Sequence, residues 1–238
     1  MFRISLFAIC LVSLSCFASE DKSGTIPKLK IGINVSPDFC FRLSHLNVDN
    51  DRVRSVKELN DAAEIPKAGY TLGLNVGYDF KSWVGIESGL QYSNKGYQRK
   101  KEVLYLPYPS SYTSTIHQRY DFHYLDIPLK VNFTVGKKKV RFFSSIGFIT
   151  NFFLAETDYT TLEIDEAKKI KNQKSHYNYN IVNVSPMLSL GVDYKINNKM
   201  NLRIEPTVRF GALKIIDAPL TAYLYNAGLN VSYYFGIK

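Results

Sequence analysis

Histidine and serine are the first residue types to test for catalysis, because a neutral imidazole beside a hydroxyl can act as general base to a nucleophile. The chain has four histidines, which are His45, His117, His123 and His176. His123 shares the apolar parity of Leu125 and Ile127, and Ser110, Ser111 and Ser114 precede it. Nothing in the spacing fixes the geometry of a His–Ser pair, so the sequence assigns no catalytic residue.

The sequence motifs do not indicate a metal site, a phosphate-binding loop or a disulfide. The chain has neither a zinc-ligand spacing nor a Gly-rich phosphate loop, and the acidic stretch Glu156–Glu166 lacks the ligand order of a calcium loop. Of Cys10, Cys16 and Cys40, only Cys40 would remain after removal of an N-terminal signal, so no internal disulfide is expected. We therefore predict no cofactor and no bound metal.

A set of charged residues lies on the polar face of the segments in which apolar and polar residues alternate. Its members are Glu87, Asp126, Lys130, Arg141, Arg203, Glu205 and Arg209. Charges on a buried face must pair, because an isolated buried charge costs several kcal/mol. They are interpreted either as a proton or ion path or as a paired plug. The plug is favoured if only eight strands enclose the interior, since such a lumen has room for side chains alone.

The elements that would position these residues are defined best by the last stretch, Ala222–Lys238. Apolar residues occupy one parity from Tyr223 to Ile237, and mostly small or polar residues occupy the other. The stretch carries no charge before Lys238, but Asn and Gly interrupt it at period two, which excludes a membrane helix. It is therefore predicted to be a transmembrane β-strand with one apolar and one polar face.

The same alternation recurs along the chain. The predicted strands are Lys28–Phe41, Ala68–Phe80, Trp83–Gly96, Arg119–Val135, Lys139–Leu154, Asn178–Ile196, Lys199–Leu213 and Ala222–Lys238. Short turns alternate with long loops, predicted at Leu43–Lys67, Tyr97–Gln118 and Glu156–Tyr177, and a shorter loop lies near Lys214–Thr221. This pattern predicts an all-β fold, an eight-stranded antiparallel up-and-down transmembrane β-barrel of OmpA/OmpX-like architecture in the outer membrane of a Gram-negative bacterium.

Alternation alone also fits a soluble lipocalin-like barrel whose apolar face points inward. Such a barrel needs an exterior rich in Lys, Glu and Thr, whereas the polar face here is mostly Gly, Asn and Ser. The composition, 45% apolar and 21% charged, fits a membrane barrel whose polar inner face dilutes its hydropathy. The apolar face is therefore predicted to contact lipid.

The strands that precede the short turns and the chain end share an apolar sequence with an aromatic residue at its third place. These aromatic residues are Tyr78, Phe133, Tyr194 and Tyr233. We expect them at one depth, as an aromatic girdle at the inner membrane interface. Lysines just beyond them, such as Lys81 and Lys199, would lie at headgroup level.

The N-terminus has the features of a secretory signal. Residues 1–18 combine Arg3, an apolar run and small residues, which predicts a signal peptide, a short periplasmic segment at 19–27 and a barrel domain at 28–238. A lipoprotein signal at Cys16 is an alternative, but the residues before it form a poor lipobox. The formal net charge of +9 is spread over strands and turns, which disfavours nucleic acid as a partner.

The segment Tyr97–Gln118 carries the strongest signal for partner binding. Tyr105, Tyr108 and Tyr112 lie among Pro and Ser, and exposed tyrosines in such a setting form contact surfaces at low entropy cost. We expect either a protein or glycan partner at this external loop, or a loop that packs over its own barrel.

Two short motifs lie on successive predicted strands, Gly89–Gly96 (GLQYSNKG) and Tyr124–Lys130 (YLDIPLK). With the closing strand they resemble the PorT-like outer-membrane β-barrel proteins of Bacteroidota. The resemblance implies the membrane and the barrel and brings no catalytic residues; the namesake of the family is linked to a secretion system. Asn226–Tyr233 also resembles the C-terminal signal read by the barrel-assembly machinery, although Gly236–Lys238 extends past the usual aromatic end.

The sequence therefore predicts a monomeric barrel whose partners are outer-membrane lipid and the barrel-assembly machinery. Its function is expected to be non-enzymatic, either structural or based on interactions of the external loops at the cell surface. One alternative is a component of a secretion or assembly apparatus. Another is a lipid-modifying enzyme that uses His123 at the outer rim.

Overall fold

The computed structural model describes residues 29–105, 113–164, 167–174 and 178–237. The predicted signal peptide, the predicted segment at 19–27 and the tyrosines Tyr108 and Tyr112 lie outside the described residues. The signal peptide, the periplasmic segment and the domain limits therefore remain predictions of the sequence alone.

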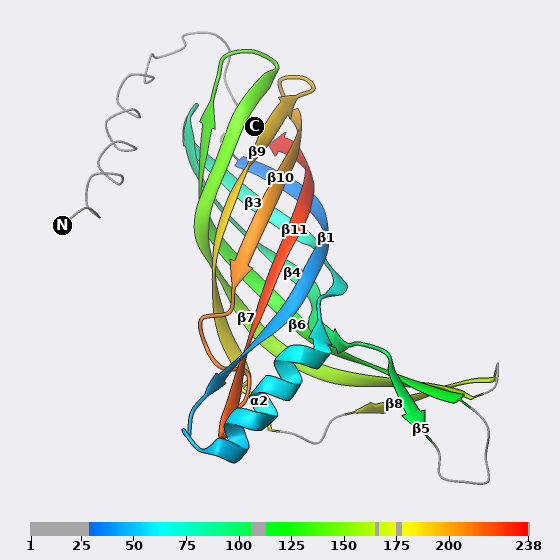
Figure 1. Ribbon diagram of the computed structural model, residues 1–238. Coiled ribbons are helices and arrows are strands. Elements are labelled where there is room, and N and C mark those ends of the chain that lie inside the picture. Colours follow the sequence, from blue (N-terminus) through cyan, green and yellow to red (C-terminus); the bar gives the residue numbers. More distant parts are fainter. Residues whose placement is uncertain (1–28, 106–112, 165–166, 175–177, 238) are drawn as a thin grey trace.

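Eight long antiparallel strands form a closed ring within the described residues (Figure 1). They are β1 (Leu29–Leu46), β3 (Lys67–Lys81), β4 (Val84–Arg99), β6 (Thr113–Val135), β7 (Val140–Ile164), β9 (Val182–Lys195), β10 (Met200–Phe210) and β11 (Leu220–Ile237). Each strand pairs with its neighbours in chain order, and β1 pairs with β11 from Leu29–Ile237 to Leu46–Leu220, which closes the ring. The predicted eight-stranded up-and-down barrel is confirmed, and closure leaves the wall without a free edge.

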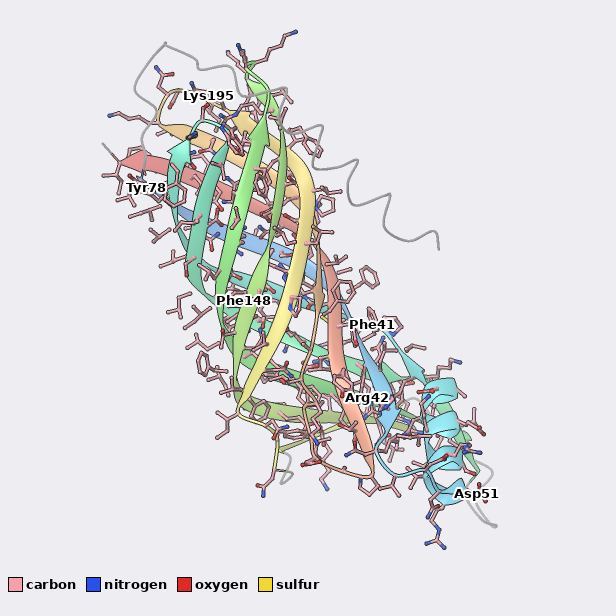
Figure 2. All side chains as sticks on the ribbon, turned by 90° about the vertical axis from the view of Figure 1, so that its left-hand side faces the viewer. Phe41, Arg42, Asp51, Tyr78, Phe148 and Lys195 are labelled. Carbon is pink, nitrogen blue, oxygen red and sulfur yellow. The ribbon has the colours of Figure 1, made fainter. Side chains whose placement is uncertain are left out.

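The two faces of the wall differ as the alternation predicts. Ile33 and Leu74 point outward and are 60% and 58% exposed, whereas Asn34 and Asn75 beside them are buried in the lumen. The outward apolar side chains cover the wall along its length, and Figure 2 shows Tyr78 outside the wall near one end. An apolar exterior around a polar interior is the arrangement of a barrel that is solvated by lipid. The soluble interpretation, with the apolar face inward, is wrong.

One predicted loop contains a helix. The segment Leu43–Lys67 was expected to be a polar loop, but it holds α2 (Asp51–Ala63) and the short strand β2 (Glu64–Ile65). The Asn50 side chain accepts a hydrogen bond from the Arg52 backbone N–H at 2.8 Å and caps the helix. None of the residues of α2 is buried, and Val56 and Leu59 are exposed, so the mainly polar segment gave only a short, weak helical pattern in the sequence.

No helix in the described part of the chain is both long and apolar enough to cross a membrane.

Two other predicted loops are largely strand. β4, β6 and β7 continue through much of Tyr97–Gln118 and Glu156–Tyr177, and they are joined there by β5 (Glu102–Tyr105) and β8 (Ala167–Lys174). We call β5, β8 and residues 113–122 and 156–164 the outer sheet. Figure 1 shows it projecting sideways from the end of the barrel that carries α2. Its sequences are rich in Thr and Tyr, which favour strands even where no buried face sets an apolar alternation.

We predict that Gly96→Ala destabilises the barrel. Gly96 has a φ of +141°, and a Cβ there would lie 2.0 Å from the backbone oxygen of Tyr120. An L-residue in this conformation costs about 1–3 kcal/mol before the clash is counted. The free energy of unfolding in urea, followed by tryptophan fluorescence of detergent-folded protein, should fall by about 2 kcal/mol or more.

The matched control is Gly77→Ala. Gly77 lies in the same wall, but a Cβ there would have its nearest neighbour at 3.6 Å, an ordinary contact. Equal losses of stability in the two variants would show that the backbone of Gly96 is not constrained as described.

Candidate functional site

The middle of the lumen is filled by charged side chains in mutual contact. Lys130 Nζ lies 3.0 Å from Glu87 Oε1 and 3.2 Å from Glu205 Oε1. Arg203 Nη1 lies 2.8 Å from Glu87 Oε2. These four predicted residues therefore form one central cluster of two cations and two anions.

Aromatic rings complete this central cluster. The Tyr234 hydroxyl donates to Glu87 Oε1 at 2.7 Å, and the Arg203 guanidinium lies 3.7 Å from the ring centroid of Phe143 and 4.5 Å from that of Tyr234. Both rings are buried. Each buried charge thus has an ionic partner together with hydrogen-bond or ring contacts, as the cost of burying charge requires.

The other predicted lumenal charges also lie in ion pairs along the lumen, and one of these pairs touches the central cluster, since Asp193 Oδ1 lies 3.7 Å from Arg203 Nε. Arg209 Nη1 contacts Asp38 Oδ1 at 2.9 Å, Lys95 Nζ contacts Asp126 Oδ2 at 3.2 Å, and Arg141 pairs with Asp193. One member of each pair was predicted from the sequence, whereas Asp38, Lys95 and Asp193 were not. Each of the three is separated by an even number of residues from other lumenal residues of its strand. Alternation along the strand could therefore have identified them.

The predicted girdle residues lie on the outer surface of the wall. Tyr194 and Tyr233 are both paired opposite Leu202 of β10, which places them at the same position along the strand ladder. Phe133 stacks against Trp83 with ring centroids 6.5 Å apart, and Tyr78 contacts Phe80 edge to face at 5.3 Å. A role for these four residues at the inner membrane interface stays a prediction.

An aromatic layer covers the lumen at its outer end. Phe122 and Tyr124 are buried, Phe122 meets Tyr179 edge to face at 5.3 Å, and Tyr124 meets Phe153 at 5.7 Å. β6 supplies two of these rings, and β7 and the segment before β9 supply the others. The layer separates the charged lumen from a cavity on its outer side.

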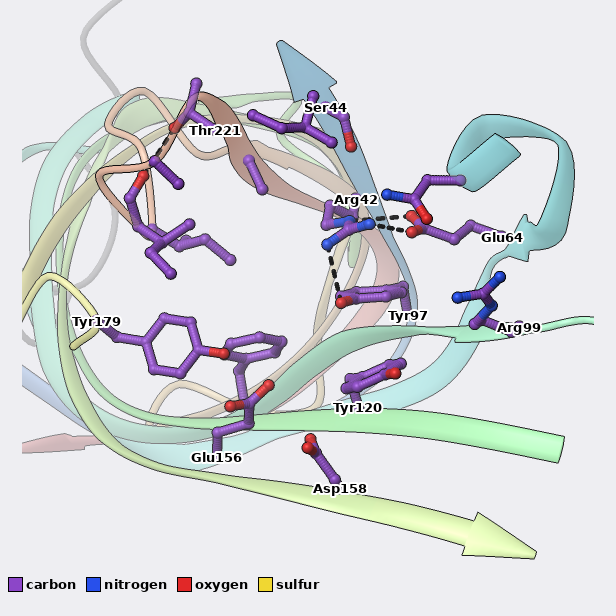
Figure 3. Close-up of a pocket in the computed structure, with 17 residues that line it drawn as sticks. Arg42, Ser44, Glu64, Tyr97, Arg99, Tyr120, Glu156, Asp158, Tyr179 and Thr221 are labelled. Atoms are coloured by element: carbon purple, nitrogen blue, oxygen red, sulfur yellow. Dashed lines mark hydrogen bonds and ion pairs between the residues drawn. The ribbon is translucent and has the colours of Figure 1, made fainter. Parts of the chain in front are cut away.

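The cavity has a volume of about 270 Å³ and lies between the outer ends of β1, β4, β6 and β7, the α2–β2 corner and residues 215–222 (Figure 3). Arg42 enters it from β1. Its guanidinium forms a two-pronged ion pair with Glu64, donates to the Tyr97 hydroxyl at 2.9 Å and lies 4.1 Å from the Tyr97 ring centroid. Tyr97 stacks on Tyr120 at 4.7 Å.

Two carboxyl groups from β7, Glu156 and Asp158, line the opposite wall of this cavity. They are two residues apart and therefore lie on the same face of the strand, which lines the cavity near Tyr179 and Tyr120 (Figure 3). Burial raises the pKa of Asp158 above its usual value, and its side chain interacts with that of Glu156. Burial also raises the pKa of Glu64, although the neighbouring Arg42 acts in the opposite direction.

The sequence pattern did not predict this cavity. Glu156 and Asp158 were expected in a solvated surface loop without a bound metal, and no role was expected for Arg42, Glu64 or Tyr97. Among the residues whose positions are described, no group of three or more His, Cys, Asp or Glu side chains is arranged to hold a metal ion.

The structure does not bring the histidine and serine considered for catalysis together. The Tyr92 hydroxyl lies 2.5 Å from His123 Nδ1, and the two rings stack at 6.0 Å. Ser114 lies on the same strand β6 as His123, roughly 30 Å away at about 3.3 Å per residue. Ser110 and Ser111 lie outside the described residues, and of Tyr105 only the backbone, in β5, is described.

The closed ring, the apolar exterior and the paired lumenal charges define a small outer-membrane β-barrel. Residues 4–235 match the family described as outer membrane protein beta-barrel domain, and the chain belongs to that family. The protein therefore resides in the outer membrane of a Gram-negative bacterium.

Several solved structures are similar to the chain. OprG from Pseudomonas aeruginosa is 11% identical over 91% of this chain and 100% of its own, with a TM-score of 0.45. Neisserial surface protein A is 7% identical over 88% and 97%, with a TM-score of 0.43. Ail, the attachment invasion locus protein of Yersinia pestis, is 11% identical over 87% and 97%, with a TM-score of 0.36. No relative was found among curated protein sequences.

We predict that Glu87→Gln strongly destabilises the protein. The change leaves Arg203 and Lys130 in the lumen with one anionic partner fewer, and breaking a buried pair on one side costs about 3–5 kcal/mol. Urea unfolding of the detergent-folded protein should show this loss. The control is Glu102→Gln, where the side chain is 51% exposed and pairs with Arg99 at 3.4 Å.

The control change should alter the free energy of unfolding by less than about 0.5 kcal/mol. A Glu87→Gln protein as stable as the control would mean that the central cluster does not hold its charges in the arrangement described.

Proposed function

We propose that this protein is a non-enzymatic surface protein, in which a filled barrel anchors an extracellular interaction surface formed by the outer sheet and α2. The observation that carries the proposal is the contrast between the interior of the barrel and its outer end. Paired charges fill the lumen, whereas β6 and β7 continue far beyond the part of the wall needed to cross a membrane.

Strand length supports an extracellular function for the outer sheet. A transmembrane strand needs about 9–11 residues. β10 has 11 residues, whereas β6 has 23 and β7 has 25. Roughly half of β6 and β7 is therefore not needed to span the membrane.

The outer sheet has the features of a surface that contacts partners. β5 and β8 form its two edges, and the backbone groups of an edge strand can pair with an added strand. β8 has the sequence AKKIKNQK, which favours an anionic partner such as an acidic protein segment or glycan. Because β1 and β11 pair with each other, the barrel itself needs no second copy, and we propose a monomer.

A component of a secretion or assembly apparatus, as the resemblance to PorT-like proteins of Bacteroidota suggests, is the second candidate. The same outer sheet would then bind a fixed neighbour in the membrane and not an external molecule. The two candidates differ in the identity of the partner.

We predict that a photo-crosslinking amino acid at Val103 captures a discrete partner in intact cells. Val103 lies in edge strand β5 and is 49% exposed. The control position is Val140, which is 59% exposed and begins β7, at the end of that strand that is far from the outer sheet and α2. Bands should be resolved by gel electrophoresis and identified by mass spectrometry.

A band specific to Val103 would support the interaction surface. An outer-membrane protein in that band would favour the secretion component, and an external protein or glycoconjugate would favour the surface role. Identical or absent products at both positions would count against the outer sheet as the binding surface.

We predict that His123→Ala leaves the composition of extracted outer-membrane lipid unchanged. His123 contacts the Tyr92 hydroxyl, and Ser114, the one candidate serine that the structure describes, is distant on the same strand, so these two residues do not form a general base and nucleophile pair. Mass spectrometry of lipid A and phospholipids from deletion, wild-type and variant strains measures this. A lipid change shared by the deletion and His123→Ala strains would instead support the enzyme.

A further inference from the structure

We propose that the side chains of Lys67 and Asn94 join in an isopeptide bond, which the folded protein forms by itself with Asp121 as the base. The three residues come from the neighbouring strands β3, β4 and β6. Lys67 is 2% exposed, and its Nζ contacts Asn94 Oδ1 and lies 2.7 Å from Asp121 Oδ1. A nucleophilic amine, a carboxamide and a basic carboxylate are the groups that such an amide exchange needs. This inference is independent of the proposed interaction surface, because it rests on contacts within the barrel wall.

The contact lies where the pairing of β4 with its neighbour is interrupted. The ladder between β3 and β4 ends at Tyr70 paired with Asn94, and pairing along that side of β4 resumes only at Ile65 of β2. The Lys67 side chain fills the interruption, and its Nζ also donates to the backbone oxygen of Lys95 at 3.4 Å. A covalent bond from Lys67 to Asn94 would therefore fasten the two strands at the point where backbone pairing is missing.

The reacting groups are shielded from water. Asn94 and Asp121 are each 5% exposed, and the stacked rings of Tyr92 and His123 lie beside Asn94, with their centroids 6.0 Å apart. A fixed contact replaces the encounter of two separate reactants, which lowers the barrier to their reaction. Exclusion of water also protects the amide product from hydrolysis.

The balance of charge around Asp121 favours the loss of one cation. Asp121 Oδ1 lies 2.7 Å from Lys67 Nζ and 3.1 Å from Arg119 Nε, so one carboxylate serves two positive groups. An isopeptide bond converts the Lys67 ammonium group into a neutral amide. Arg119 then remains as the ionic partner of Asp121, and a buried charge without its own counterion is removed.

The proposed reaction balances without an added reagent. Asp121 takes a proton from the Lys67 ammonium group, and the electron pair of Nζ attacks Asn94 Cγ, which lies one C=O bond of about 1.2 Å from the contacted oxygen. Nδ2 of Asn94 receives a second proton from Nζ and leaves as ammonia with the electrons of its bond to Cγ. Ammonia then takes the proton from Asp121 and departs as ammonium. One C–N bond forms, one breaks, and no group is oxidised or reduced.

His123 is positioned to assist the departure of ammonia. Its Nδ1 lies 3.5 Å from Asn94 Nδ2 and 2.5 Å from the Tyr92 hydroxyl. An imidazole nitrogen at this place can relay a proton to the leaving nitrogen.

The test is the mass of the full chain before and after folding. Protein kept unfolded in urea should have the mass of its sequence, whereas after folding in detergent micelles its mass should be lower by one ammonia molecule, about 17 Da. Tandem mass spectrometry of a tryptic digest should then identify residues 58–81 joined to residues 82–95 through Lys67 and Asn94. Protein purified from outer membranes should contain the same joined peptides.

Two variants remove a reacting group, and a third is the control. Lys67→Arg keeps the positive charge without the primary amine, and Asp121→Asn removes the base, so both should retain the full mass of their sequences after folding. Lys101→Arg changes a lysine that is 61% exposed and pairs with Glu163 in the outer sheet, and it should lose ammonia as the wild type does. Faster migration of unheated than of boiled protein verifies that each variant is folded.

The wild-type protein alone can contradict the proposal. Folded wild-type protein with the full mass of its sequence would overturn it. A loss of ammonia that maps to a cyclic imide within a single peptide would do the same, as would a loss of water that places the bond at Asp121. Persistence of the loss in folded Lys67→Arg protein would also exclude Lys67 as the nucleophile.

Discussion

Pairing of the first strand with the last is the interaction on which the rest of the structure depends. Lipid offers no hydrogen-bond partners, so each unpaired backbone group of an open edge would cost several kcal/mol there. The ladder from Leu29–Ile237 to Leu46–Leu220 removes both edges at once. Closure at eight strands then fixes a narrow lumen that only side chains can fill. The inward-facing residues of every strand must therefore fill this lumen and pair their polar groups with one another.

The lumenal charges are best understood as determinants of register. Some pairs join neighbouring strands, as Arg141 with Asp193 does, and others join strands that are distant in sequence, as Asp38 with Arg209 and Glu87 with Arg203 show. A slip of one residue would move a charged row from the lumen to the lipid face. Buried ion pairs add little net stability compared with apolar packing, but a displaced pair would leave charges in hydrocarbon. The cluster around Lys130 thus penalises incorrect pairing more than it strengthens the correct one.

Alternation with period two was sufficient to predict the wall, because every membrane-spanning residue faces either lipid or lumen. It failed beyond the membrane, where that constraint ends. α2 lacks a buried face, and the outer sheet is solvated on both sides over much of its length, so neither carries a strong periodic signal. The cavity was out of reach for a different reason. Arg42, Tyr97 and Asp158 come from separate strands and meet only after the ring has closed.

The unequal strand lengths make the outer end of the barrel asymmetric. β6 and β7 continue past the barrel into the outer sheet, which projects sideways, whereas β10 ends at Phe210 and β9 starts at Val182. The rim is therefore a slanted opening and not a level ring. Among the described residues, the outer sheet extends from the side of the rim formed by β6 and β7. The protein accordingly has a front and a back, and its rotation about the membrane normal decides what it can meet.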